Sequence, residues 1–159
     1  MAATTSPAPR CRCRRPHARV DRDRARYLAA IDRLAADPDD RVRTGAVSDR
    51  LGVSPASVTE MFGRLDAAGL VDHEKRAGAR LTERGERIAA ELAWRRCVVR
   101  TFFSAELDFG LPEGTGFRIG FALPREGVER LSAITDASPG DPCRSSGDAA
   151  AGCPWASGD

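Results

Sequence analysis

Hydrophobic residues recur at helical spacing in the first patterned part of the chain. They predict a helix over about residues 21–36, with the apolar positions Tyr27, Leu28, Ile31 and Leu34. A second, shorter helix is predicted from Thr44, its expected N-cap, to Leu51, because Val47 and Leu51 lie four residues apart. Gly52 then supplies a turn.

The pair Ser54-Pro55 is a strong signal for the start of a third helix. A serine hydroxyl can cap the first turn, and proline is favoured at the first helical position. Gly69 stands where a C-terminal cap belongs. The buried face of this helix is expected to consist of Val58, Met61, Phe62 and Leu65.

A hairpin follows the third helix. A short strand is expected from Leu70, and a turn whose tip is Ala77-Gly78 leads into a returning strand over residues 79–81. Thr82 is the expected cap of a long fourth helix. The apolar positions of that helix are Ile88, Leu92, Val99 and Phe103.

Residues 112–116 are predicted to form a turn, followed by a short helix near 117–122 and a last helix opened by Pro124. Together the elements predict a mainly α fold. It is a winged helix-turn-helix with a two-stranded wing, followed by a small helical dimerisation region.

Composition divides the chain into four parts. Residues 1–19 lack apolar periodicity and are predicted to be a disordered arm, or else to precede the natural start of the protein. Residues 20–82 are the predicted winged-helix DNA-binding domain, 83–136 the dimerisation region, and 137–159 a flexible tail. No run approaches the roughly 20 apolar residues that cross a bilayer, and no apolar stretch resembles a secretory signal. A cytoplasmic protein is expected.

The net charge of +2 says little about partners, but the distribution of charge favours DNA binding. The N-terminal end of a recognition helix enters the major groove, and small hydroxylated residues there allow close approach to phosphates and room for a thymine methyl. Glu60 can accept a hydrogen bond from cytosine. Basic residues before the second helix, Arg41 among them, and on the wing can hold phosphates. The predicted DNA-binding residues are Arg43, Thr44, Ser54, Pro55, Ala56, Ser57, Thr59, Glu60, Arg64, Lys75, Arg76 and Arg80.

An enzyme is not expected. The chain has two histidines, neither near paired carboxylates, and no glycine-rich phosphate loop. A winged helix that serves only protein interaction is the alternative to DNA binding, because capped helices and surface arginines also occur in proteins that never touch DNA.

The stretch from Arg43 to Met61, which includes the turn and the Ser54-Pro55 start, closely resembles the recognition motif of the diphtheria toxin repressor family of metal-dependent regulators. The resemblance continues through Ala68-Gly69-Leu70-Val71 and through residues 80–85. It covers about 24–103 well and 104–134 weakly. It implies a homodimeric repressor on a double-stranded DNA operator, with iron or manganese bridging the first helix and the dimerisation region.

The positions that this resemblance assigns to metal ligands carry residues of other chemistry. Arginine has no free lone pair at neutral pH and repels a dication, while Phe and Gly offer no side-chain ligand. The usual binuclear metal site is therefore not expected. The positions concerned are Arg26, Arg96, Arg100, Phe117, Gly120 and Phe121.

Thiols provide a different candidate sensor. Cys97, Cys143 and Cys153 could hold a soft metal or form a redox disulfide. Alternatively, Cys97 is a small buried residue and the two tail cysteines are incidental. A MarR-like or thiol-based winged-helix regulator, which responds to an organic ligand or an oxidant, also remains open.

Most of the few aromatic residues fall after the wing. So small a segment would not cover them alone, which favours pairing with a second copy of the chain. The apolar residues concerned are Phe102, Phe103, Leu107, Phe109, Phe117, Ile119, Phe121 and Leu123.

Overall fold

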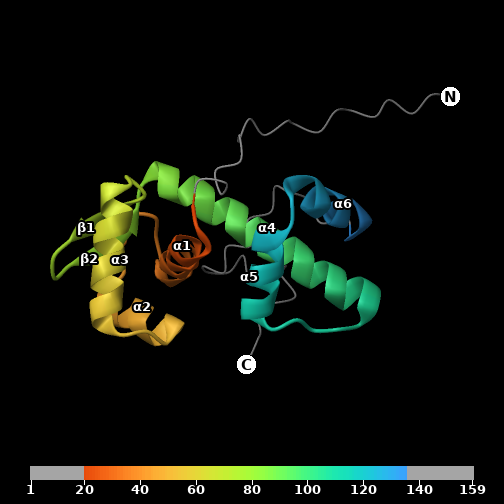
Figure 1. Ribbon diagram of the computed structural model, residues 1–159, viewed down its shortest axis with the longest axis horizontal. Coiled ribbons are helices and arrows are strands. Elements are labelled where there is room, and N and C mark those ends of the chain that lie inside the picture. The colour runs from red at the N-terminus through yellow and green to blue at the C-terminus, as the bar shows by residue number, and fades with distance from the viewer. Residues whose placement is uncertain (1–19, 136–159) are drawn as a thin grey trace.

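The computed structural model describes residues 20–135, which form a mainly helical fold with one antiparallel two-stranded sheet (Figure 1). The predicted fold class is confirmed. The predictions for residues 1–19 and 137–159 concern segments outside the described residues. In chain order the elements are α1 (Arg22–Leu34), α2 (Thr44–Leu51), α3 (Pro55–Ala67), β1 (Val71–Glu74), β2 (Gly78–Leu81), α4 (Glu83–Leu107), α5 (Glu113–Ala122) and α6 (Arg125–Thr135).

Side-chain caps set three of the helix starts. Asp21 accepts from the backbone N–H of Arg24 at the start of α1. Ser54 accepts from the backbone N–H of Ser57, and Pro55 is the first residue of α3, as predicted. Thr82 accepts from the backbone N–H of Gly85 and so begins α4, also as predicted. Each cap satisfies an amide that has no partner within its helix.

Other boundaries differ from the expected ones. Thr44 is the first residue of α2 rather than its cap, because Arg43 occupies the extended N-cap position without a side-chain cap bond. The hairpin tip is residues 75–77, with Arg76 in the left-handed region at φ 72°, and Gly78 already belongs to β2. α5 begins at Glu113 instead of 117, because Pro112 opens that helix. α1 ends at Leu34, two residues early, because Ala35 turns to extended backbone.

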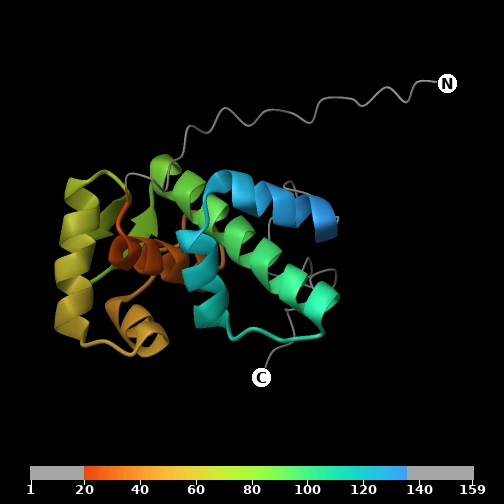
Figure 2. The same ribbon diagram turned by 45° about the vertical axis from the view of Figure 1, so that its right-hand side comes forward.

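The core surrounds α1, which lies between the α2–α3 pair and the α4–α5 pair (Figures 1 and 2). Its fully buried residues include Leu28 and Ile31 of α1, Phe62 and Leu65 of α3, and Val47 of α2. The predicted apolar stripes of α1 and α3 therefore point inward, with Met61 only partly buried against this core. Leu34, a predicted apolar position of α1, is an exception: it is exposed because the helix ends there. Burying these faces supplies the main stabilisation of a domain of this size.

A bridge to the segment before α2 anchors the wing at its base. β1 and β2 pair from Val71 opposite Leu81 to Glu74 opposite Gly78. Val42 and Ala79 then exchange two backbone hydrogen bonds, of 2.8 and 3.0 Å. A Cβ at position 78 would overlap the carbonyl oxygen of Val42, and φ there is +110°, so this close approach requires glycine.

α4 runs through the molecule and carries α5 and α6 on its second half (Figure 2). Phe117 belongs to the main core and stacks on Phe121, so these two aromatic residues are used within the chain. Leu107 and Phe109, at the far end of α4, are more than half exposed. Across residues 20–135, no helix combines the length and the apolar character that a membrane span requires.

Candidate nucleic-acid interface

The N-terminal half of α3 presents a polar, small-residue surface. Val58, Phe62 and Leu65 on one side of the helix are fully buried and fix it against α1. The opposite side is exposed. The predicted contact residues Ser54, Pro55, Ala56, Ser57, Thr59 and Glu60 all lie on it.

Local hydrogen bonds occupy part of this surface. The hydroxyls of Ser54 and Ser57 lie 2.9 Å apart, and the Thr59 hydroxyl donates to the backbone carbonyl of Pro55 at 3.0 Å. Arg64 donates to the Glu60 carboxylate at 2.5 Å, and both side chains are more than half exposed. Arg64 therefore neutralises Glu60, so the acidic residue at this end of α3 does not repel a phosphate backbone uncompensated.

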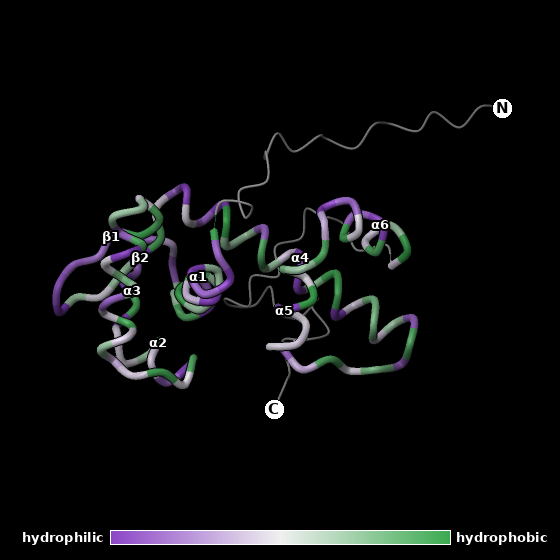
Figure 3. Tube along the Cα trace, in the orientation of Figure 1, coloured by the Kyte–Doolittle hydropathy of each residue, from purple (hydrophilic) through white to green (hydrophobic). Residues whose placement is uncertain are grey.

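The hairpin tip carries unpaired positive charge. Lys75 and Arg76 are exposed, and within residues 20–135 no carboxylate lies within ion-pairing distance of either side chain. The connection between β1 and β2 is the strongly hydrophilic projection at the edge of the domain in Figure 3. Arg43, the N-cap of α2, is another exposed cation of the DNA-binding domain, whereas Thr44 is half-buried.

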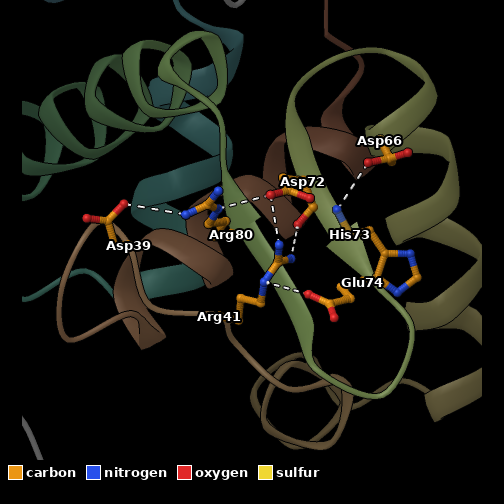
Figure 4. Close-up of polar contacts among 7 residues, drawn as sticks. All are labelled: Asp39, Arg41, Asp66, Asp72, His73, Glu74 and Arg80. Atoms are coloured by element: carbon orange, nitrogen blue, oxygen red, sulfur yellow. Dashed lines mark hydrogen bonds and ion pairs between the residues drawn. The ribbon is translucent and has the colours of Figure 1, made fainter.

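Asp72 organises the base of the wing (Figure 4). Its Oδ2 accepts from Arg41 at 2.8 Å and from Arg80 at 3.0 Å, while Arg80 also lies 3.5 Å from Asp39. The hydrogen bond from Arg80, together with the charge of Arg41, outweighs burial and lowers the pKa of Asp72. Arg80, a predicted DNA contact, is thus held inside the wing by two carboxylates.

The residues predicted from the sequence did not include Asp72. The hairpin register could have indicated its role, because Asp72 lies directly opposite Arg80 on the neighbouring strand. The backbone N–H of the neighbouring His73 donates to Asp66 at 3.1 Å (Figure 4). The ring of His73 also packs edge-on against Phe62, with 5.3 Å between the ring centroids, so His73 has a structural role.

Residues 23–79, which run from the second residue of α1 through α2, α3 and β1 into β2, match the model of the iron-dependent repressor N-terminal DNA-binding domain. The resemblance drawn from the sequence motif is thereby confirmed for this domain.

Two proteins that this chain resembles in sequence are named as transcriptional regulators. An uncharacterised HTH-type transcriptional regulator of Aeropyrum pernix is 32% identical over 102 residues, which are 63% of this chain and 57% of that protein. The HTH-type transcriptional regulator MntR of Oceanobacillus iheyensis is 37% identical over 60 residues, or 38% of this chain and 41% of MntR. The chain spans about half the length of these relatives.

Solved structures of regulators share the fold. A manganese-dependent transcriptional repressor in complex with manganese superposes with a TM-score of 0.64 at 26% identity, over 71% of this chain and 52% of that one. The manganese regulator SloR gives 0.62 at 23% identity, over 72% of this chain and 54% of SloR. The chain therefore has the winged helix-turn-helix fold of metal-dependent regulators.

The positions that the family resemblance assigns to metal ligands do not suit a dication here. Arg96 is 7% exposed and donates to Glu113 at 3.3 Å, so a guanidinium fills the place of a ligand. A Cβ at Gly120 would lie 3.0 Å from the backbone carbonyl of Arg95, which is a tight contact, and glycine itself offers no side-chain ligand. Among residues 20–135, no three His, Cys, Asp or Glu side chains are grouped as metal ligands.

Only one of the three thiol candidates lies among the described residues. Cys97 lies half-buried on α4, while Cys143 and Cys153 lie outside the described residues. A joint role of the three thiols stays a prediction.

Proposed function

We propose that this chain is a dimeric DNA-binding transcriptional regulator, with α3 in the major groove and the wing tip on the flanking backbone. The observation that carries the proposal is the exposed N-terminal end of α3, together with the exposed wing-tip cations Lys75 and Arg76, which pair with no carboxylate of residues 20–135, in a segment that matches a repressor DNA-binding domain. Such a protein acts on the chromosome, and hence in the cytoplasm.

The chemistry of α3 supports a close approach to DNA. Its first-turn amides carry the partial positive charge of the helix N-terminus, which attracts phosphate. Ala56 and Ser57 are small and exposed, so the backbone can reach the groove floor, and Ala56 can contact a thymine methyl. Lys75 and Arg76 then supply sequence-independent attraction.

Charge reversal at the wing tip tests the proposal. We expect Lys75→Glu with Arg76→Glu to weaken binding to the DNA upstream of the protein's own gene by roughly tenfold per lost phosphate contact. The slope of log affinity against log salt should fall by about one per contact. Fluorescence anisotropy across a salt series measures both quantities.

Arg130→Glu provides the control, because Arg130 is an exposed cation of α6 in an i,i+4 pair with Glu126. It should leave DNA affinity within about twofold of wild type. Equal affinity of the wing variant and wild type would instead favour the protein-interaction alternative.

The same titration, run in chelator and then with manganese, tests the metal switch. Because arginines replace the ligands at positions 26, 96 and 100, we expect tight binding in chelator and no gain from manganese. Binding that requires manganese would show that the chain holds the metal with other residues.

The proposal includes dimerisation of the chain. Leu107, Phe109 and Ile134 are each more than half exposed, near the ends of α4 and α6. Exposed apolar side chains on adjacent elements are typical of an interface. We expect light scattering to give a dimer mass at micromolar concentration, and Leu107→Glu with Phe109→Glu to give a folded monomer. A monomeric wild type would contradict the dimer.

A further inference from the structure

A cavity of about 680 Å³ opens between α1, α2, α4 and the N-terminal end of α5. The elements that form it meet near the centre of the molecule in Figures 1 and 2. Glu113 is the sole carboxylate among its lining residues. Six arginines line it as well: Arg22, Arg26, Arg33, Arg50, Arg96 and Arg118.

This concentration of charge is local. The whole chain has a net charge of only +2, so a generally basic surface does not account for it. Arginine stays protonated at any physiological pH, and like charges at short range repel one another. Six guanidiniums around one cavity therefore favour the binding of an anion there.

α1 contributes three of the arginines from one face. Arg22, Arg26 and Arg33 recur at helical spacing, and the small residues Ala29 and Ala30 between them leave the cavity open. Arg22 and Arg26 are exposed, and no carboxylate of residues 20–135 lies within ion-pairing distance of them. Their charge is available to a ligand.

Glu113 shows where the other arginines converge. Its carboxylate lies 3.1 Å from Arg33, 2.8 Å from Arg50 and 3.3 Å from Arg96, which come from three different helices. Burial works to raise the pKa of Glu113, but the charges of Arg33, Arg96 and Arg50 outweigh it and lower that pKa. One internal carboxylate already occupies the anion position of this cluster, and Arg22, Arg26 and Arg118 surround the remaining space.

The backbone at the start of α5 also favours a bound anion. Pro112, Glu113, Gly114 and Thr115 form the first turn of α5 and line the cavity. The positive end of the α5 dipole therefore faces the space that the arginines surround. The volume of the cavity falls within the range of small-molecule binding sites, about 300–1,000 Å³.

We propose that this arginine-lined cavity binds a small polyanion that carries phosphate groups or several carboxylates. Guanidinium groups bind both kinds of oxyanion through paired hydrogen bonds. Bound there, the anion would join α1 and α2 of the DNA-binding domain to α4 and α5. A role for the anion as the signal of the regulator rests on the proposed function, whereas the site itself does not.

Calorimetric titration of the full chain tests the site without DNA. Inorganic pyrophosphate, inorganic phosphate and citrate are the probes, at constant pH and ionic strength. We expect pyrophosphate or citrate to bind with one-to-one stoichiometry and more tightly than phosphate. The stronger of the two probes distinguishes phosphate from carboxylate chemistry. Binding of none of them would overturn the proposal.

Paired variants locate the binding. Arg26→Gln removes an exposed lining charge and should weaken the bound anion at least about tenfold. Arg24→Gln is the control, since Arg24 lies on the same helix, pairs with Asp21 at 3.4 Å and does not line the cavity. Equal losses in both variants would place the binding elsewhere on the protein.

Glu113→Gln separates a binding site from a merely structural ion cluster. Removing the internal carboxylate leaves Arg33, Arg50 and Arg96 to the added anion, so the affinity for pyrophosphate should rise. A fall in affinity, in a variant that keeps its helical circular dichroism, would contradict the proposal.

The DNA titration with and without pyrophosphate tests regulation separately. A change of threefold or more, absent in Arg26→Gln, would support an effector role. If pyrophosphate does not bind and Arg26→Gln weakens DNA binding instead, the arginines contact DNA and the small-anion site is wrong. If the protein does not bind DNA but binds pyrophosphate as expected, the anion site is supported and the proposed regulator function is contradicted.

Discussion

Arg95→Ala is expected to lower the free energy of unfolding by about 3–5 kcal/mol, the range for breaking a buried charged group's interactions. Arg95 is fully buried on α4. Its Nε donates to Glu91 at 2.9 Å, and its Nη1 donates to the backbone carbonyls of Gly120 at 3.0 Å and Leu123 at 2.8 Å. Removing it leaves two carbonyls at the end of α5 without this donor.

The position of those carbonyls explains the size of the effect. They lie at the C-terminal end of α5, where the helix dipole is negative and a cation is favoured. Arg95 thus connects α4 to the junction of α5 and α6. The substitution also removes the nearest cation of Glu91, a carboxylate that is only 10% exposed, and leaves it with Arg125 at 3.6 Å.

Arg87→Ala is the matched control, because Arg87 lies on the same helix and makes the same i,i+4 pair, with Glu83 at 2.8 Å. It is more than half exposed, so its loss should cost less than about 0.5 kcal/mol. Urea unfolding measures both variants. Equal effects of the two substitutions would mean that the buried hydrogen bonds of Arg95 contribute nothing net.

Gly85→Ala is expected to destabilise the protein by about 2–3 kcal/mol, although alanine is the better helix former by about 1 kcal/mol. A Cβ at this buried position of α4 would overlap the carbonyl oxygen of Leu70. That oxygen also accepts from the backbone N–H of Thr82 at 3.1 Å, so it cannot move without disturbing the cap of α4. Backbone overlap therefore outweighs helix propensity.

Gly63→Ala should have the opposite sign. Gly63 lies inside α3, is exposed, and has no atom within 4 Å of a Cβ built there. Alanine there should stabilise the protein by about 0.5–1 kcal/mol. Thermal and urea unfolding of both variants provide the test, and a stabilised Gly85→Ala would show that the junction of wing and α4 is more adaptable than this packing implies.

Local signals in the sequence determined the fold. The starts of α3 and α4 follow from Ser54-Pro55 and Thr82, because a cap acts within three residues of its own position. The buried stripe of α3 follows from the spacing of Val58, Phe62 and Leu65, and the motif around it predicted the match to the iron-dependent repressor DNA-binding domain. Such features depend on neighbours along the chain, so the sequence displays them directly.

The tertiary structure alone decided what each arginine does. Arg80 and Arg76 lie four residues apart on one hairpin, yet Asp72 and Asp39 hold Arg80 while Arg76 projects outward. Arg95 and Arg96 are adjacent on α4, yet Arg95 donates to a carbonyl near the end of α5 and Arg96 lines the arginine-rich cavity.

The sequence does not reveal the roles of these arginines because their partners lie far away along the chain. Glu113 gathers arginines from positions 33, 50 and 96, and a side chain in one helix carries no local mark of a partner 63 residues away. The interactions of a charged side chain depend on the groups within a few ångströms of it and on its exposure to water. Folding fixes both, which is why the sequence located the DNA-binding domain while only the packing of its helices revealed the arginine-lined cavity beside it.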